Sequence, residues 1–398
     1  MLIDVTRLVH RKFRGRLPTG VDRVSLAYVE RYGARSAALL RLAGRWRVLR
    51  QRDSQPVFDA LISREPHSAR QLAWRLARAL PVRTVGDTRH RALLNTGHSG
   101  LEQPRYAAEV RRRGLRPLYF VHDLIPITHP EYTRPGEDDR HRRRVQTVLA
   151  TGAALVVNSQ ATRLQLADYA HRLGRRLPDC VVAPLAPAAL PTPAQRPPID
   201  RPYFVVVGTI EPRKNHLLLL QVWRRLVEEQ GDAAPRLVVI GQRGWECAPV
   251  LSFLEQCTAL RDFVIARPHC SDGDLATWLQ HARALLFPSF VEGFGLPLVE
   301  ALARRVPVIA SRLPAFQEMA GEIPEFLDPL DGPAWQQAIR DYMQPDGLRP
   351  QLQRQRMSGY SAPTWSAHFA VVDALVDSCL RPAGQPVTQG GWIHAARG

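Results

Sequence analysis

The sequence has no long hydrophobic run. No stretch of about 18 apolar residues occurs in the chain, so no segment is predicted to cross a membrane as a helix. Residues 1–6 have a strand-like pattern and not the charged and apolar regions of a signal peptide. We therefore expect a cytoplasmic protein.

Cysteine is scarce and scattered. The five cysteines stand at positions 180, 247, 257, 270 and 379, and no two of them form a Cys-x-x-Cys pair. An odd number at irregular spacing excludes a regular disulfide framework and gives no zinc-site pattern. We expect reduced thiols and no bound metal.

Lysine is also scarce, and acidic residues are under-represented in one half of the chain. Only Lys12 and Lys214 among the 54 basic residues are lysines. Residues 1–200 hold 35 Lys and Arg against 17 Asp and Glu, whereas residues 201–398 hold 19 against 20. A general preference for arginine does not explain this asymmetry. A basic first half favours an anionic partner such as a membrane surface, a lipid-linked phosphate or nucleic acid.

The apolar segments predict the fold class. A chain of 398 residues is expected to form two domains. Helical segments alternate with apolar segments that we expect to be strands, at residues 2–5, 92–95, 117–121, 153–157, 203–207, 236–240, 263–266, 284–287 and 306–310. This alternation predicts an α/β protein with two Rossmann-like, doubly wound parallel sheets that face each other across a ligand cleft.

Prolines mark the domain boundary. Seven prolines fall within residues 184–202, which predicts a stiff linker. We expect a first domain at residues 1–190 and a second at 191–363. A helix at 364–381 is expected to cross back to the first domain, and residues 382–398 to form a mobile tail.

Two glycines and two glutamates surround the predicted start of a helix near residue 296. Gly293 and Gly295 leave backbone N–H groups open to a phosphate, and Pro297 suits the first helical turn. Glu292 precedes the glycines and Glu300 lies one turn into the helix, where each carboxylate could accept hydrogen bonds from vicinal hydroxyls. Phosphate held between two diols describes a nucleotide sugar.

A second candidate site follows the predicted strand at 203–207. Gly208 stands at the carboxyl end of this strand, and Arg213 and Lys214 precede the next helix. Open α/β sheets bind ligands at this edge, and both cations could reach a diphosphate there. Because Lys214 is one of only two lysines, a compact ammonium is favoured over an ordinary solvated turn.

Residues 208–215 and 292–300 together resemble the family-4 retaining glycosyltransferases of the GT-B fold, which carry a pair of glutamates eight positions apart. The similarity covers roughly residues 1–380. It extends to the bacterial mannosyl- and rhamnosyltransferases of surface polysaccharide assembly through His122-Asp123-Leu124-Ile125-Pro126, Pro130-Glu131, Asn158-Ser159 and Ala320-Gly321.

This resemblance implies a role for each site residue. Lys214 should contact the donor diphosphate, and Arg213 could replace the arginine that many members have where this chain has Thr209. Glu300 should bind the ribose hydroxyls and Glu292 those of the transferred sugar. The remaining implied positions are Gly208, the backbone of Gly293, Phe294, Gly295 and Leu296, His122 facing the donor sugar from the first domain, and Gly20 near the sugar or acceptor.

The resemblance also implies the reaction. We expect retaining, metal-independent transfer of a hexose, with mannose from GDP-mannose favoured, to a hydroxyl of a growing, lipid-linked surface glycan. No cofactor is expected beyond the nucleotide-sugar donor. The basic first domain should bind the acceptor on the cytoplasmic face of the inner membrane, partly through basic helices at residues 70–78 and 140–144.

Several alternatives remain open. The chain could be a GT-B enzyme acting on a soluble acceptor or on phosphate, or a basic nucleic-acid-binding protein. The basic segments lack interleaved aromatic residues and a recognition motif, which disfavours nucleic acid. Asp272-Gly273-Asp274 has the form of a metal-binding motif, but Ser271 with Asp274 fits a helix start better. Glu318 fits either a functional or a structural role. The nucleotide base is expected near residues 241–244 and 267–271.

Overall fold

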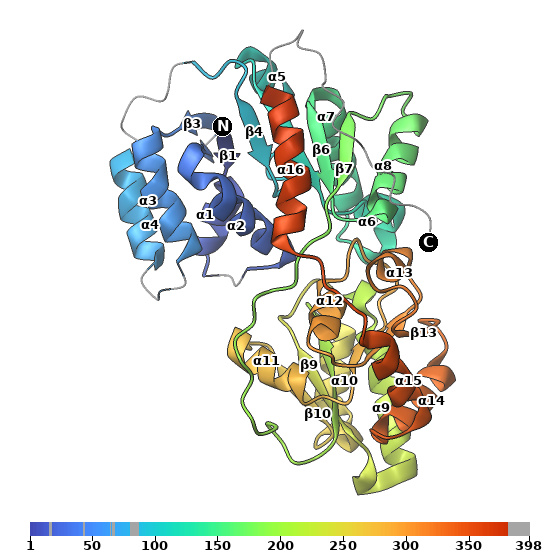
Figure 1. Cartoon of the computed structure of the whole chain (residues 1–398). Helices are drawn as coiled ribbons and strands as arrows, with labels where there is room; N and C mark the ends of the chain where they lie inside the picture. The colour runs from blue at the N-terminus through green and yellow to red at the C-terminus, as the bar shows by residue number, and fades with distance from the viewer. Residues whose placement is uncertain (16–17, 43, 64, 66–67, 80–86, 381–398) are drawn as a thin grey trace.

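The computed structural model describes residues 1–15, 18–42, 44–63, 65, 68–79 and 87–380. These residues form two α/β domains, each built around one sheet (Figure 1). Two doubly wound sheets, as predicted from the sequence, are thus confirmed. The segment 382–398, predicted to be a mobile tail, lies outside the described residues.

The first sheet has seven strands in the order β3-β2-β1-β4-β5-β6-β7. They are β1 (Leu2–Asp4), β2 (Ala37–Leu42), β3 (Arg45–Val48), β4 (Ala92–Asn95), β5 (Arg116–Val121), β6 (Ala154–Val157) and β7 (Asp179–Val182). The expectation of a wholly parallel sheet is wrong at one edge, where β3 pairs antiparallel with β2. This strand is only partly buried and carries two arginines, so it lacks the unbroken apolar run that marks a buried parallel strand.

Helices pack on both faces of this sheet. The first domain contains α1 (Thr6–Phe13), α2 (Gly20–Tyr32), α3 (Gln51–Ile62), α4 (Ser68–Ala79), α5 (Pro104–Arg112), α6 (Ile125–Thr128), α7 (Glu137–Thr151) and α8 (Gln160–Arg172), with 3-10 turns at Gly33–Arg35 and Pro130–Tyr132. On β5, Leu118 and Phe120 enter one buried cluster, while Tyr119 and Val121 enter another on the opposite face. Burial on both faces explains why the sequence of β5 is apolar throughout.

The second sheet is parallel throughout, in the order β10-β9-β8-β11-β12-β13. Its strands are β8 (Tyr203–Val207), β9 (Arg236–Ile240), β10 (Val264–Arg267), β11 (Leu285–Phe287), β12 (Val308–Ser311) and β13 (Glu325–Leu327). The helices are α9 (His216–Gln230), α10 (Ala248–Gln256), α11 (Asp272–Gln280), α12 (Leu296–Ala303), α13 (Pro314–Ala320), α14 (Gly332–Met343) and α15 (Leu348–Met357), and 3-10 turns lie at Pro212–Lys214, Gly231–Ala233 and Thr258–Leu260.

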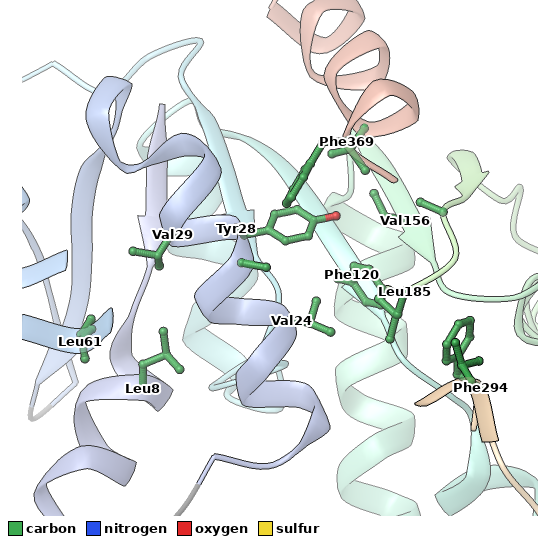
Figure 2. Packing of buried hydrophobic residues seen from close by; sticks show 14 of the residues in the cluster. Leu8, Val24, Tyr28, Val29, Leu61, Phe120, Val156, Leu185, Phe294 and Phe369 are labelled. Carbon is green, nitrogen blue, oxygen red and sulfur yellow. The ribbon is translucent and has the colours of Figure 1, made fainter. Parts of the chain in front are cut away.

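The last described helix, α16 (Trp365–Leu380), leaves the second domain and packs on the first (Figure 1). His368 Nε2 lies 3.0 Å from the hydroxyl of Tyr28, and the hydroxyl of Tyr32 donates to Asp373 at 2.8 Å. Figure 2 shows Phe369 beside Tyr28, with their ring centroids 5.3 Å apart. The chain therefore crosses between the domains twice, once through the proline-rich linker and once before α16.

The two domains share one buried cluster. This cluster runs from Phe120 and Val156 of the first sheet through Leu185 in the linker to Phe294 and Phe287 of the second domain (Figure 2). A shared core holds the carboxyl ends of the two sheets close together. Within the described ranges, no helix has the length and apolar character needed to span a bilayer.

Candidate active site

Two loops at the carboxyl edge of the second sheet meet in a cluster of charges. Lys214 Nζ lies 2.5 Å from Glu292 Oε1, and an Arg213 terminal nitrogen lies 2.7 Å from Glu292 Oε2. Ser289 donates to the same carboxylate at 2.8 Å, and Arg213 also pairs with Glu211 at 2.6 Å. The loop after β8 and the loop after β11 are thereby joined through Glu292.

Burial and opposite charges set the ionisation of this cluster. Burial alone would raise the pKa of Glu292, but the charges of Arg213 and Lys214 outweigh it and lower the pKa to about 2. Burial lowers the pKa of Lys214, and Glu292 opposes that shift. Glu292 is therefore ionised at neutral pH, and its two carboxylate oxygens anchor Arg213 and Lys214 side by side.

The glycine before these cations makes room for the lysine. Gly208 has a φ of 148°, and a Cβ there would lie 3.3 Å from Cε of Lys214. A left-handed backbone with a side chain stacked against it requires glycine. The Lys214 ammonium also lies 4.7 Å from the ring centroid of Phe287, which fixes its direction from a third side.

The glycines of the 293–295 loop have two different structural causes. Gly295 precedes α12 with a φ of 100°, and a Cβ there would be 2.6 Å from the Phe316 ring. Gly293 instead touches the first domain: a Cβ would lie 2.6 Å from the carbonyl oxygen of His122. The Gly293 carbonyl also accepts a hydrogen bond from Ser159 Oγ at 2.9 Å. Close approach of the domains therefore explains Gly293 without any ligand.

His122 stands at the end of β5, opposite this loop. Its Nε2 lies 2.7 Å from the carbonyl oxygen of Thr96, so Nε2 carries the proton and Nδ1 is left as a hydrogen-bond acceptor. Burial between Phe120 and His98 lowers its pKa to about 4. The ring is neutral at pH 7 and suited to accept a hydrogen bond from a hydroxyl.

Gly20 and Leu296 meet across the domain boundary. Gly20 is the first residue of α2, and a Cβ on it would lie 3.3 Å from Cδ1 of Leu296 at the start of α12. The structure therefore brings together Gly20, His122, Gly293 and Leu296, which lie in three separate segments of the sequence. Phe294 is buried in the shared core, so only its backbone is open to a ligand.

Glu300 lies one turn into α12 and is buried, with 6% of its surface exposed. Burial raises its pKa, and the charge of Arg23 opposes the shift. Its Oε1 lies 3.5 Å from a terminal nitrogen of Arg23 and 3.3 Å from the backbone nitrogen of Ala188 in the linker. The two glutamates of the motif thus have different partners: Glu292 pairs within its own domain, and Glu300 with the first domain and the linker.

Three further predictions concern residues around this centre. Ser271 Oγ accepts from the backbone nitrogen of Asp274 at 3.1 Å, so the helix start is confirmed. Within the described ranges, no group of three or more His, Cys, Asp or Glu side chains is arranged to hold a metal ion. The third prediction places the nucleotide base near residues 241–244. A Cβ on Gly241 would lie 1.8 Å from the carbonyl oxygen of Gly208, so close packing against Gly208 and Thr209 accounts for the glycine at position 241.

Sequence reasoning missed two contacts between the domains. Glu318 accepts hydrogen bonds from the backbone nitrogens of Gln160 at 2.6 Å and Ala161 at 3.1 Å, and so caps α8 of the other domain. Tyr132 stacks on Phe290 with ring centroids 5.2 Å apart. Glu318 therefore has a structural role. No local sequence pattern could give these contacts, because each joins residues more than 150 positions apart.

Arg23 was also missed, although the sequence contained a signal for it. A cation in the first turn of a helix is disfavoured by the helix dipole. Arg23 nevertheless occupies the first turn of α2, three residues after Gly20. Such a placement indicates partners outside the helix, and the second domain supplies them.

Comparisons with known proteins agree with this geometry. Residues 193–354 match the family model described as glycosyl transferases group 1. The O-antigen chain mannosyltransferase B of Escherichia coli is 31% identical over 59% of this chain and 63% of its own length. The serotype-specific mannosyltransferase WbdA of Escherichia coli is 30% identical over 54% of this chain and 28% of its own length. The matched region thus spans less than two thirds of either relative.

A solved structure extends the likeness to the whole fold. Anabaena Alr3699/HepE in complex with UDP superposes with a TM-score of 0.65 at 13% identity, over 94% of this chain and 99% of that one. At 13% identity, the match shows that the two proteins share a fold and shows nothing further. Residues 193–354 are therefore similar to the glycosyl transferases group 1 family, within a chain that has the two-domain GT-B fold.

Proposed function

We propose that the protein is a retaining hexosyltransferase that moves mannose from a nucleoside-diphosphate sugar to a hydroxyl of a growing surface glycan. The observation that carries this proposal is the pair Lys214 and Arg213, anchored on Glu292 and opposed across the domain boundary by His122. It is supported by the two Escherichia coli relatives, which are mannosyltransferases.

In this proposal the donor replaces contacts within the site. The diphosphate takes Lys214 and Arg213 as partners, together with backbone N–H groups at the start of α12. Glu292 is then available for the hydroxyls of the sugar, and Glu300 for those of the ribose. The neutral Nδ1 of His122 accepts a hydrogen bond from a sugar hydroxyl.

In this mechanism no side chain of the enzyme has to act as a base, because the nucleophile is the acceptor hydroxyl and not a water molecule. The bond between the anomeric carbon and the diphosphate oxygen breaks, and the acceptor oxygen bonds to the same face of that carbon. The acceptor proton passes to the departing phosphate. Lys214 and Arg213 stabilise the charge that develops on the leaving group, which is the main catalytic contribution in this arrangement. Neighbouring domains exclude water, which otherwise competes as acceptor.

The donor is tested by thermal unfolding with a panel of nucleotides. We expect GDP and GDP-mannose to raise the melting temperature more than UDP, dTDP or their sugars, because bound ligand stabilises the folded state. Retention and metal independence are then checked by NMR of the product anomer and by turnover in EDTA. Absence of a shift with every nucleotide would refute the proposed function.

For the acceptor we propose a lipid-linked glycan, reached from the cytoplasmic face of the inner membrane. Of the two basic helices, α7 pairs Arg140 and Arg144 with Glu102. Helix α4 instead contains no acidic residue and exposes 54% of Trp74, with Arg78 4.5 Å from its ring centroid. A tryptophan flanked by arginines suits the interface of an anionic bilayer.

This surface is tested with vesicles of phosphatidylcholine, with and without phosphatidylglycerol. We expect binding only to anionic vesicles, a loss in high salt, and a reduction by Trp74→Ala together with Arg78→Gln. The double variant Leu164→Ala and Arg172→Gln, on exposed positions of α8, serves as the control. If turnover with a soluble acceptor equals turnover with a lipid-linked one, and vesicle binding does not depend on anionic lipid, the soluble-acceptor alternative is favoured.

A further inference from the structure

We propose that Arg23 is a positioning residue that holds the carboxylate of Glu300 until the ribose of the donor takes its place. This inference rests on the proposed function, because it takes Glu300 as the ribose site. It adds a first-domain residue to the donor site and predicts a competition between that residue and the nucleotide.

Arg23 bridges two carboxylates of the opposite domain. One terminal nitrogen lies 3.5 Å from Glu300 Oε1 on α12, and the other lies 3.2 Å from Asp272 Oδ1 on α11. Arg23 itself belongs to α2 of the first domain. The guanidinium therefore spans the domain boundary at the glutamate that we assign to the ribose.

The same turn of α2 is fixed against α12. Gly20, three residues earlier, lies against Leu296 at the start of α12. The side chain of Asp22 is held by Thr19 in the capping box of α2 and by Arg7 at 2.8 Å. Because the backbone around Arg23 is anchored on both sides, its side chain can move while the helix stays in place.

Glu300 requires hydrogen-bond donors, and Arg23 supplies them in this structure. Its carboxylate is buried, and a buried carboxylate without donors is strongly disfavoured. Ribose hydroxyls would supply donors in place of the guanidinium, so in this proposal Arg23 and the ribose compete for the Glu300 carboxylate. Asp272 is more exposed, at 27%, and can retain Arg23 after the exchange.

The competition predicts that removing Arg23 strengthens nucleotide binding. We would titrate GDP and UDP into the full chain and into Arg23→Gln by calorimetry at pH 8. We expect the dissociation constant of the preferred nucleotide to fall about two- to fivefold, the range of a partly exposed ion pair. The dissociation constant for Arg23→Lys, which keeps the charge, should lie between those of the unmodified chain and Arg23→Gln.

Pyrophosphate separates competition for Glu300 from a general opening of the domains. It can occupy the diphosphate position but has no ribose, so its affinity should not change in Arg23→Gln. The control is Arg31→Gln on the same helix, which removes an ion pair with Asp373 and leaves Glu300 untouched. We expect Arg31→Gln to bind both ligands as the unmodified chain does.

Each other outcome overturns the inference. Weaker nucleotide binding in Arg23→Gln would mean that Arg23 contacts the donor directly, and an equal gain for pyrophosphate would mean that it only holds the domains together. If the unmodified chain binds no nucleoside diphosphate, the proposed function fails as well. If it binds one and Arg23→Gln binds no tighter, only the role of Arg23 fails.

Discussion

At the scale of single residues, the site is defined by which charges share a partner. Glu292 holds two cations, and both lie in the loop between β8 and α9. The chain uses lysine only twice, and one of those lysines is the buried partner of this glutamate. A compact ammonium fits beside Gly208 and over Phe287, where a planar guanidinium would need more room.

Lys214→Gln should reduce catalysis strongly without unfolding the chain. The substitution removes the cation that we assign to the leaving diphosphate, so we expect a loss of about 100- to 1,000-fold in kcat/KM for the donor. The control is Lys12→Gln, since the ammonium of Lys12 donates to the carbonyl oxygen of Ser63 far from the site. Equal losses in the two variants would contradict the assignment.

Glu292→Gln should destabilise the fold as well as reduce activity. It leaves Arg213 and Lys214 buried beside each other without their shared carboxylate, at a cost of about 3–5 kcal/mol in the free energy of unfolding. Urea denaturation measures this loss. Adding Lys214→Met to Glu292→Gln should restore part of the stability, because Arg213 keeps its pair with Glu211 and the buried ammonium left without that carboxylate is removed. If the double variant is no more stable than Glu292→Gln, the uncompensated charge is not the cause of the lost stability.

At the scale of elements, the contacts between the domains join loops and helix ends. The start of α8 receives Glu318 from the second domain and offers Ser159 to the carbonyl of Gly293. The start of α12 receives Gly20 from α2. The candidate active site thus lies where helix N-termini of both domains converge, an arrangement suited to anionic ligands.

Gly293→Ala should push the domains apart. Its Cβ would overlap the carbonyl oxygen of His122, and backbone cannot move aside as a flexible side chain can. We expect kcat to fall at least about tenfold, while each domain stays folded by circular dichroism. The control is Gly359→Ala, since a Cβ at Gly359 meets no atom within 4 Å. Unchanged kcat in Gly293→Ala would show that the two domains need not approach this closely during turnover.

At the scale of the whole molecule, stability depends on pH in part through three histidines, His122 and His141 packed on either side of His98. Burial lowers the pKa of His122 from 6.5 to about 4 and also lowers the pKa values of His98 and His141. The unfolded chain therefore binds more protons than the folded chain between about pH 4 and pH 6.5. Stability is fully present above pH 6.5 and is lost as the pH falls toward 4.

This pH dependence is measurable by urea denaturation. We expect the free energy of unfolding to fall by about 3 kcal/mol for His122 alone between pH 7.5 and pH 4, with further losses from the other two histidines. His98→Gln and His141→Gln, which cannot take up a proton, should each reduce the slope. A flat profile across this range would show that these rings are not held neutral.

Particular residues show how far the sequence could predict the fold and the site. The strands at 92–95, 203–207 and 236–240 were predicted with their observed bounds, because burial on both faces gives unbroken apolar runs. The edge strands β3 and β7 were missed, since partly exposed strands lack that pattern. The interior strand β2 was also missed, although its first four residues are buried. The loops bearing Glu292 and Lys214 were located by glycine and charge. Tyr132 and Glu318 act through contacts that no local pattern encodes, whereas Arg23 had a local signal in its position in the first turn of α2.

The largely parallel sheets and the loops at their carboxyl ends could be predicted from the sequence, because apolar runs, glycines and charges are local features of the chain. Only the tertiary structure decided which charges pair: Glu292 with Lys214 and Arg213, and Glu300 with Arg23. These pairs join residues 78 to 277 positions apart. The pairs of Glu292 form where two loops of the second domain meet, and the Glu300–Arg23 pair depends on how the two domains pack against their shared core.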